Sequence, residues 1–391
     1  MSKIKVAVLG ATGAVGQRFV QLLENHPWFE VTALTGSDRS VGQLYGDVCR
    51  WVLDKPMPDY ARKLCVAPTE PGLDASVAFS ALPSDQAQAI EPAFAQAGHG
   101  VCSNASAYRM DDDVPLLIPE VNPDHTALIK VQQANRGWSG FIATNPNCTS
   151  TGFTIAFRPL LDTFGIKQAF VVSMQALSGA GYPGVASLDA VDNVIPYIGG
   201  EEPKVETEPL KMLGKLSASA SAQPSLRGAA FATKQSSVER QHLPIGTEIA
   251  SPTALAMTTA PYVIDAAFKI SAHTNRVAVI DGHTVCVSLE CDQPIGAREA
   301  AQAMLDYEWA EIVRSLPSSP ERVIEVRSEP DRPQPRRDRE AGRGMTTVVG
   351  RVREDPLFHV KFVVLSHNTI RGAAGGSLLN AELLVAQGIV K

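Results

Sequence analysis

The sequence lacks the features of a membrane protein or a disulfide-stabilised secreted protein. No apolar run reaches the roughly 18 residues that a membrane-spanning helix needs. The six cysteines form no C-x-x-C pair, and a chain of 391 residues can bury a core without disulfides. The start, MSKIKVAVLG, runs directly into an apolar segment without a signal-peptide pattern. We therefore expect free thiols, no membrane partner and a cytoplasmic location.

The chain also lacks an excess of positive charge. Its 35 Lys and Arg residues face 41 Asp and Glu residues, for a net charge of −6. Nucleic acid is therefore not an expected partner. The 45% of hydrophobic and 19% of charged residues are typical of a globular protein with a sizeable core. At roughly 150 residues per domain, the length favours two domains and leaves three open.

The first part of the chain alternates strand-like and helix-like patterns. Expected strands are residues 3–9, 30–34, 76–81, 100–103 and 141–144, and a helix is expected at 84–97. Such alternation predicts a parallel sheet covered on both faces. We therefore expect an α/β fold whose first domain, residues 1–148, is a Rossmann-type dinucleotide-binding domain.

The strand patterns become longer after about residue 165. Expected strands are residues 168–177, 268–280, 283–290, 346–352 and 358–365. Asp281-Gly282, between two of these strands, predicts a hairpin turn. We expect an α+β second domain at residues 149–365, with a largely antiparallel sheet. The Ser/Ala/Thr-rich residues 215–260 and the charged, proline-rich residues 328–343 are expected as surface loops.

A glycine-rich turn joins the first expected strand to the first expected helix. Its G-x-x-G-x-x-G spacing is a variant of the dinucleotide-binding fingerprint. The glycines let the backbone approach a pyrophosphate, and the helix N-terminus offers N–H groups and a positive dipole end. The alternative is a tight turn without a cofactor. The predicted cofactor contacts are Gly10, Thr12, Gly13, Ala14, Val15 and Gly16.

The residues after the second expected strand discriminate between NAD and NADP. An acidic residue there would bind the ribose 2′-hydroxyl of NAD. This chain instead has Ser37, Arg39 and Ser40, which could hold a 2′-phosphate through charge-assisted hydrogen bonds. We therefore predict NADP, although Asp38 leaves a role for NAD open.

Cys148 is the candidate nucleophile. It follows the expected strand 141–144 through Asn145-Pro146-Asn147, and a helical pattern begins at Ser150. A helix N-terminus favours a thiolate, and a lowering of the thiol pKa by about 1.5 units is worth roughly 2 kcal/mol. The alternative is a buried structural cysteine.

Arg276 and His283 are the candidate partners of the thiol. They flank the Asp281-Gly282 turn, seven residues apart. An arginine can bind a substrate carboxylate bidentately, and a histidine can shuttle a proton. Spacing alone leaves ordinary structural roles open for both residues.

Further polar residues are candidates for substrate contacts. Gln175 is an amide in an apolar strand, where it either packs against backbone or touches substrate. Glu201 and Lys204 are one helical turn apart, a spacing that also fits a weak surface ion pair. Arg109 follows the strand 100–103 at the edge where ligands of parallel sheets bind, and is a candidate anion clamp.

Together these residues resemble the aspartate-β-semialdehyde dehydrogenase family, in the branch found in archaea and fungi. The matching segments extend from residue 6 to residue 376. NPNCT combined with R-x₆-H is specific, whereas the glycine loop is shared by many families. The segments are VAVLGATGAVGQ, SNASAYRM, NPNCTSTG, MQALSGAGYPG, GGEEPK, NRVAVIDGH, DRPQPRRDR and SHNTIRGAAGG.

The resemblance implies catalytic and substrate-binding roles. Cys148 would be the nucleophile and His283 the acid–base group. Arg276 would bind the substrate α-carboxylate, with Glu201 near the α-amino group. Gln175 would orient the substrate.

The resemblance also implies a phosphate site, a cofactor contact and an assembly. Arg109, Lys204 and Asn147 would form the phosphate site. Asn368 would lie near the nicotinamide carboxamide, so that residues 366–391 return to complete the first domain. Members of the family are homodimers or homotetramers built through the second domain.

The implied reaction interconverts aspartate 4-semialdehyde plus inorganic phosphate with 4-aspartyl phosphate through a cysteine thioester. It belongs to the biosynthesis of Lys, Met, Thr and Ile, and no metal ion is expected. The alternatives are a malonyl-CoA reductase or an N-acetylglutamyl-phosphate reductase on the same scaffold, and a catalytically silent NADP-binding regulator. Asn147, Glu201 and Lys204 favour the phosphate-using reaction, and the presence of Cys148 and His283 argues against a silent regulator.

The sequence departs from the family pattern in two places. Residues 215–260 are longer than the usual connection. Pro203 interrupts a stretch that is expected to be acidic, so Glu202 could take the place of Glu201.

Overall fold

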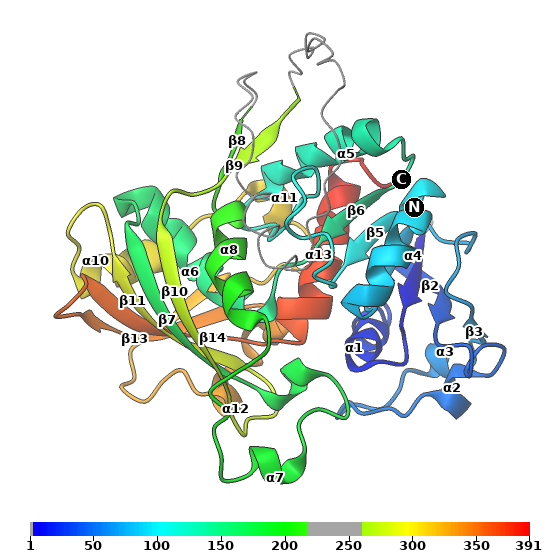
Figure 1. Cartoon of the computed structure of the whole chain (residues 1–391), viewed down its shortest axis with the longest axis horizontal. Coiled ribbons are helices and arrows are strands. Elements are labelled where there is room, and N and C mark those ends of the chain that lie inside the picture. The colour runs from blue at the N-terminus through cyan, green and yellow to red at the C-terminus, as the bar shows by residue number, and fades with distance from the viewer. Residues whose placement is uncertain (1–2, 218–259) are drawn as a thin grey trace, which may run out of the picture.

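The computed structural model describes residues 3–217 and 260–391. Two six-stranded sheets lie side by side, one built from the first part of the chain and one from the second (Figure 1). The chain returns to the first sheet at its C-terminal end, where the helix α13 (Gly375–Ala386) packs next to β5. The architecture confirms a Rossmann-type domain combined with an α+β domain.

The first sheet is entirely parallel, with the strand order β3-β2-β1-β4-β5-β6. The chain begins at the centre of the sheet, moves outward to β3, and then returns to the other side of β1. Ligands of such sheets bind at the carboxyl ends of the strands where the order reverses, here between β1 and β4. The strands are β1 (Ile4–Leu9), β2 (Phe29–Thr35), β3 (Val66–Ala67), β4 (Val77–Ser80), β5 (Gly100–Ser103) and β6 (Phe141–Thr144).

Helices cover both faces of this sheet. Alternate residues of a strand point to opposite faces, so Val6 and Val8 join one core cluster and Ala7 and Leu9 join another. The first cluster includes residues of α1 and α13, and the second includes residues of α4. The helices of this half are α1 (Ala14–Leu22), α2 (Tyr45–Val48), α3 (Asp59–Arg62), α4 (Ser84–Gln96), the 3-10 helix η1 (Pro123–Ala127) and α5 (Leu128–Arg136).

The second sheet is mixed, with the order β10-β7-β11-β14-β13-β12. Its two outer pairs are parallel and its three inner pairs antiparallel, which confirms the largely antiparallel sheet. The strands are β7 (Gln168–Gln175), β10 (Lys269–Arg276), β11 (His283–Glu290), β12 (Ile324–Arg327), β13 (Thr347–Glu354) and β14 (Val360–Ser366).

The predicted hairpin at Asp281-Gly282 is wrong. β10 and β11 are not neighbours, because β7 lies between them and pairs with both. Residues 277–282 instead cross the end of β7, where Val277 N–H donates to the carbonyl of Gln175 and Leu177 N–H to that of Val279. The Asp-Gly dipeptide favours a turn, but the pairing of buried strands far apart in the sequence decides which strands are adjacent.

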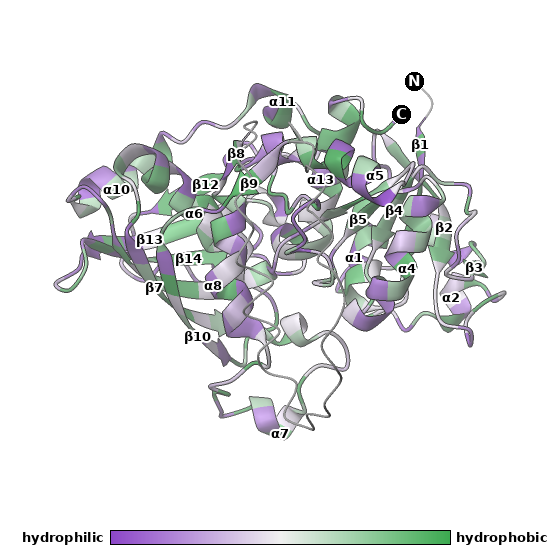
Figure 2. Ribbon diagram, turned by 45° about the horizontal axis from the view of Figure 1, so that its top comes forward, coloured by the Kyte–Doolittle hydropathy of each residue, from purple (hydrophilic) through white to green (hydrophobic). Residues whose placement is uncertain are grey.

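One face of the second sheet packs against the long helix α6 (Cys148–Phe164), which is mostly hydrophobic (Figure 2). The helices α8 (Glu201–Met212) and α10 (Ala297–Leu305) complete this cover. α8 contacts both α6 and β10. Its residues Glu208 and Lys211 also contact Arg109 of the first half, so α8 lies between the two halves of the molecule (Figure 1).

The two expected loops are described to different extents, residues 328–343 in full and residues 215–260 only at their ends. Residues 215–260 begin with β8 (Lys215–Ser217), which pairs with β9 (Tyr262–Ile264), and residues 218–259 lie outside the described part of the chain. Residues 328–343 contain short turns of helix. The remaining short elements are η2 (Leu177–Ala180), α7 (Ser187–Ala190), α11 (Glu311–Arg314), α12 (Pro335–Asp338), η3 (Ala341–Gly344) and the π-helical turn η4 (Ile370–Ala374).

Candidate active site

Cys148 is the first residue of α6, directly after β6 and one connecting segment. Asn147 caps this helix, because its side-chain oxygen accepts hydrogen bonds from the backbone N–H groups of Thr149 and Ser150 at 2.9 and 3.1 Å. The placement at a helix N-terminus confirms the sequence prediction. Gly372 packs so closely that a Cβ atom there would lie 2.7 Å from that of Cys148, so only glycine fits.

His283 is the direct partner of the cysteine. Its Nε2 lies 3.2 Å from Sγ of Cys148, although the two residues are 135 positions apart. Nδ1 of the same ring accepts the backbone N–H of Ala176 at 3.0 Å. Since Nδ1 is an acceptor, the neutral ring carries its proton on Nε2, facing the sulfur. The pKa of His283 is lowered to about 3, first by burial and then by the positive charges of Arg276 and His367.

The thiol itself is not acidic in this structure. Burial, and to a lesser extent the Glu201 carboxylate, raise the pKa of Cys148 to about 12, although Arg109 and Arg276 act in the opposite direction. The helix N-terminus had favoured the expectation of a lowered pKa. The expectation is wrong for this state of the site, because the desolvation of the thiolate outweighs the favourable charges.

Arg276 lies at the end of β10, and its guanidinium and the His283 ring both lie close to Gly179. Its Nη1 donates to the carbonyl of Ala176 at 2.8 Å, and burial lowers its pKa. Ala176 therefore orients both partners, with its carbonyl toward Arg276 and its N–H toward His283. The guanidinium and the thiol belong to one site, as the sequence analysis predicts for the pair.

Glu201 sits at the centre of a buried network. Its Oε1 accepts hydrogen bonds from the side-chain amides of Asn147 at 2.9 Å and Gln175 at 3.1 Å. Glu202 instead accepts the backbone N–H of Thr274 in β10 at 3.2 Å. Glu201, rather than Glu202, is therefore turned toward the cysteine.

Pro203 does not disturb this arrangement. It lies in the first turn of α8, where a backbone N–H has no partner within the helix and proline is tolerated. Lys204 follows with its Nζ 3.8 Å from Oε2 of Glu201 and its side chain partly exposed. The doubt that Pro203 raised about Glu201 and Lys204 is therefore removed.

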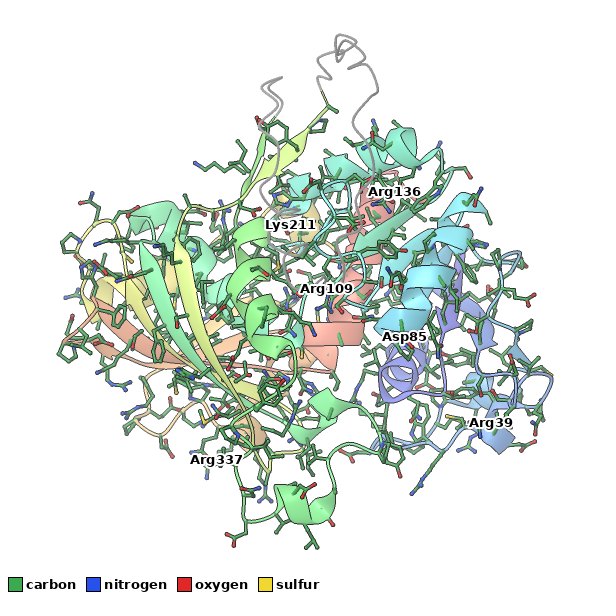
Figure 3. All side chains as sticks on the ribbon, viewed as in Figure 1. Arg39, Asp85, Arg109, Arg136, Lys211 and Arg337 are labelled. Carbon is green, nitrogen blue, oxygen red and sulfur yellow. The ribbon has the colours of Figure 1, made fainter. Side chains whose placement is uncertain are left out.

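Arg109 lies between the two halves of the molecule, near α8 (Figure 3). It is buried, with Nη1 bound to Glu208 at 3.0 Å and Nη2 to the carbonyl of Asn104 at 2.7 Å. Its positive charge acts on the Cys148 thiol. Arg109 and Lys204 thus bring two cations to the side of the site that α8 covers.

Two buried charged residues on α8 were not predicted from the sequence. Glu208 and Lys211 are buried and both contact the segment that carries Arg109. Together with Glu201 and Lys204 they recur at i, i+3, i+7 and i+10, which places all four on one face of a helix. This spacing was a signal in the sequence, because a charged stripe that faces another element needs partners there.

The glycine loop occupies the carboxyl end of β1. The N-cap of α1 is Gly13, which offers no side chain, so the first N–H groups of the helix are open to a ligand. A Cβ atom at Gly16 would lie 2.3 Å from the carbonyl oxygen of Gly10. Thr12, Ala14 and Val15 lie in this same turn and first helical residues. A backbone cradle of this kind suits a pyrophosphate.

The segment that follows β2 exposes polar side chains close to the end of the strand. Ser37, Asp38 and Arg39 are exposed, whereas the buried Ser40 donates its hydroxyl to the carbonyl of Ser37 at 2.7 Å. Ser40 thus shapes the turn that presents Ser37 and Arg39. The exposed hydroxyl and guanidinium have the chemistry of a 2′-phosphate site.

Asn368 ties together segments on both sides of the site. Its side-chain oxygen accepts the N–H of Gly282 at 2.8 Å, and its amide donates to the hydroxyl of Ser178 at 2.7 Å. These contacts bring the segment before α13 next to the turn η2 and the start of β11. The cofactor contact expected of Asn368 stays a prediction.

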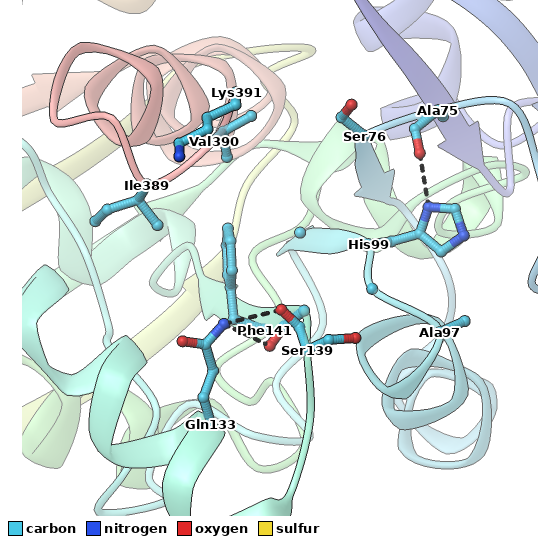
Figure 4. Close-up of a pocket in the computed structure, with 13 residues that line it drawn as sticks. Ala75, Ser76, Ala97, His99, Gln133, Ser139, Phe141, Ile389, Val390 and Lys391 are labelled. Atoms are coloured by element: carbon cyan, nitrogen blue, oxygen red, sulfur yellow. Dashed lines mark hydrogen bonds between the residues drawn. The ribbon is translucent and has the colours of Figure 1, made fainter.

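The described part of the chain also contains a pocket away from Cys148. This pocket of about 300 Å³ lies next to His99, Phe141 and Lys391 (Figure 4). It borders the residues that precede β4, β5 and β6, at the opposite sheet edge from Cys148. Among residues 3–217 and 260–391, no three His, Cys, Asp or Glu side chains are grouped to hold a metal ion. No helix in these ranges is long and apolar enough to cross a membrane.

Comparisons with known proteins cover the whole chain. Residues 5–129 match the NAD-binding domain of semialdehyde dehydrogenases, and residues 157–225 and 248–371 match their dimerisation domain. An aspartate-semialdehyde dehydrogenase of Archaeoglobus fulgidus is 49% identical over 99% of this chain and 100% of its own length. The enzyme of the same name from Candida albicans is 40% identical over 100% of both chains.

The likeness extends to solved structures. A crystal structure of aspartate semialdehyde dehydrogenase with NADP from Candida albicans covers 100% of both chains, with a TM-score of 0.81 and 38% identity. One from Vibrio cholerae covers 98% of this chain and 99% of its own, with a TM-score of 0.69 and 25% identity. These likenesses favour the main interpretation of the sequence over the reductase alternatives. The chain belongs to the family of aspartate-semialdehyde dehydrogenases, in agreement with its resemblance to archaeal and fungal members.

Proposed function

We propose that this chain interconverts aspartate 4-semialdehyde and inorganic phosphate with 4-aspartyl phosphate, with NADP as the cofactor. This reaction serves the biosynthesis of Lys, Met, Thr and Ile. The observation that carries the proposal is the pair of Cys148 and His283, 3.2 Å apart, at the start of a helix, with the charges of Arg109 and Arg276 acting on the thiol. A thiol nucleophile among cations suits an anionic aldehyde whose acyl group is held as a thioester.

Cys148 forms the covalent bond to the substrate. Its thiolate adds to the aldehyde carbon, and the carbonyl oxygen becomes the alkoxide of a hemithioacetal. Loss of hydride from that carbon gives a thioester, and attack by a phosphate oxygen gives the acyl phosphate and returns the thiolate. Because burial raises the pKa of the thiol, the positive charges of Arg276 and Arg109 are needed to favour the thiolate.

His283 acts on the oxygen of these intermediates. Nδ1 is occupied by the N–H of Ala176, so Nε2–H is the group that faces the sulfur. We propose that it donates a hydrogen bond to the alkoxide, the form from which hydride leaves. The acid–base role that the resemblance implies requires a second proton on the ring, which burial and Arg276 oppose.

Of the remaining residues, some bind the α-carboxylate and α-amino groups of the substrate and others bind phosphate. Arg276 binds the α-carboxylate through its guanidinium, and Glu201 accepts from the α-amino group while it holds Gln175 and Asn147 in place. Arg109 and Lys204 bind phosphate on the side covered by α8. Phosphate then approaches the thioester from the α8 side.

NADP fits the open end of α1 and the segment after β2. The uncapped N–H groups of α1 and the close approach at Gly16 suit the pyrophosphate, while Ser37 and Arg39 suit the 2′-phosphate. Asn368 would hold the nicotinamide end near Cys148. When bound, the cofactor accepts or supplies the hydride.

We further propose a homo-oligomer built through the second domain, residues 149–365. The family match to a dimerisation domain supports this assignment. The sheet face opposite α6 is partly exposed and carries the apolar residues Phe170, Val172 and Met174 beside the exposed Ser271 and His273. Such a face is suited to a second copy, and light scattering would discriminate a homodimer from a homotetramer. Residues 1–148 with 366–391 would form the cofactor domain, and the six free cysteines are consistent with a cytoplasmic location.

The decisive assay is spectrophotometric. The protein is incubated with NADP, phosphate and aspartate semialdehyde, and the absorbance of the reduced cofactor is followed. We expect reduction that depends on both substrates. Reduction that needs coenzyme A instead of phosphate, or none at all, would overturn the proposal.

A further inference from the structure

Glu208 is a buried carboxylate for which the reaction outlined above has no role. It lies on α8 and is 2% exposed. Its Oε1 accepts from Nη1 of Arg109 at 3.0 Å, and its Oε2 accepts from the backbone N–H of Asn147 at 2.6 Å. One side chain thus joins a proposed phosphate-binding arginine to the residue directly before the nucleophile.

The neighbouring contacts show that this link is part of a larger clamp. Nζ of Lys211, one turn further along α8, donates to the carbonyls of Arg109, Asp111 and Val114 at 2.8, 2.7 and 2.8 Å. Glu208 therefore holds the side chain of Arg109, and Lys211 holds its backbone. A buried carboxylate is costly unless it is paired and hydrogen-bonded, and Glu208 satisfies both requirements through groups of the active site.

The other end of the site is held by other hydrogen bonds, although Asn147 is shared, because its side-chain amide donates to Glu201. Arg276 is oriented by the carbonyl of Ala176, and Gln175 by Glu201. Arg276 and Gln175 are the last residues of β10 and β7, and within the described part of the chain neither forms a hydrogen bond with Glu208. Loss of Glu208 would therefore disturb the geometry at the phosphate side and leave the carboxylate side in place.

We propose that Glu208 is a positioning residue of the phosphate subsite, acting through the Arg109 guanidinium and the Asn147 backbone. The proposal rests on the proposed function. The negative charge of Glu208 weakens the attraction of Arg109 for an anion. Removal of the Glu208 carboxylate therefore has opposite effects if the residue acts through its charge alone and if it acts by positioning Arg109. A positioning role predicts weaker use of phosphate, whereas a role in charge alone predicts stronger use.

The test compares steady-state kinetics of the wild type and Glu208→Gln, with phosphate and aspartate semialdehyde varied separately. Glutamine keeps the shape but cannot accept from both donors, and a charge-assisted hydrogen bond is lost. We expect the KM for phosphate to rise roughly ten-fold or more, with the KM for aspartate semialdehyde within about two-fold of the wild type. An unchanged or lowered KM for phosphate would overturn the proposal, as would an equal rise of both constants.

A matched control lies on the same helix. Glu206 also accepts a backbone N–H, that of Ala272 in β10 at 3.0 Å, but it faces the sheet. Glu206→Gln should leave both KM values unchanged, and a phosphate-selective defect in this variant would count against the special role of Glu208. Thermal melting and NADPH titration establish that each variant folds.

Glu208→Asp keeps the inference testable if the glutamine variant does not fold. Aspartate retains the charge, but its shorter side chain cannot reach both Arg109 and Asn147. We expect the same selective rise in the phosphate KM, and wild-type kinetics would overturn the positioning role. A wild-type protein that shows no phosphate-dependent reduction of NADP would instead refute the proposed function itself.

Discussion

The backbone N–H of Ala176 donates to Nδ1 of His283 at 3.0 Å, and this single contact determines how the histidine faces Cys148. A ring whose Nδ1 accepts a hydrogen bond keeps its proton on Nε2 while it is neutral. Nε2 lies 3.2 Å from the sulfur. The cysteine and the developing oxyanion therefore meet a hydrogen-bond donor.

The first prediction concerns the chemical role of His283. Glutamine can place an amide N–H close to the position of Nε2, whereas alanine cannot. One oxyanion donor is worth roughly 10²–10³ in kcat, so we expect His283→Gln to be at least about ten-fold more active than His283→Ala. The phosphate-dependent assay measures both variants. Equal loss in the two would indicate that a proton acceptor, rather than a donor, has been removed.

The second prediction concerns pH. Burial and the charges of Arg276 and His367 lower the pKa of His283 to about 3. The ring should therefore remain neutral, with the proton on Nε2, throughout pH 5 to 8. Since the unfolded chain takes up this proton below its ordinary pKa of about 6.5, the contribution of His283 to stability is complete above that pH and declines as the pH falls toward 3. ¹⁵N NMR of histidine-labelled protein, with His283→Gln for assignment, follows the ring, and a midpoint between pH 5 and 8 would contradict the assignment.

The third prediction concerns Arg276. Lysine retains the charge but lacks the planar fork that contacts both a carboxylate and the carbonyl of Ala176. We expect Arg276→Lys to lower kcat/KM for aspartate semialdehyde by roughly 10²-fold, because charge-assisted contacts contribute about 1.5–3 kcal/mol each. The KM for phosphate should change little. Near-wild-type kinetics would mean that Arg276 is structural.

Much of the fold was predictable because its local patterns agree with its tertiary structure. The expected strands at residues 100–103, 141–144 and 283–290 have the observed bounds, since apolar runs there end at polar or glycine residues. Sheet order was not predictable. Asp281-Gly282 has the local chemistry of a hairpin, but β7, about 110 positions earlier in the chain, occupies the place between the two strands.

The same division holds for the site. Cys148, His283 and Arg276 were recognisable because motif and spacing mark them. The raised pKa of the Cys148 thiol could not be predicted from the sequence, because burial depends on tertiary packing and not on the spacing of residues. Glu208 was missed for a related reason: its function depends on Arg109, 99 positions away.

The last prediction concerns cofactor choice. Arg39 is exposed in the segment that follows β2, next to Ser37, where the 2′-phosphate of NADP would lie. Arg39→Ala removes a guanidinium that NAD does not use, so the KM for NADP should rise about ten-fold while that for NAD stays within about two-fold. The size follows from one charge-assisted hydrogen bond at an exposed site, worth about 1.5 kcal/mol. Lys130→Ala, which removes an exposed charge from α5, should change neither constant. An equal rise of both constants in Arg39→Ala would show that Arg39 does not discriminate between the cofactors, and that Ser37 or Asp38 does.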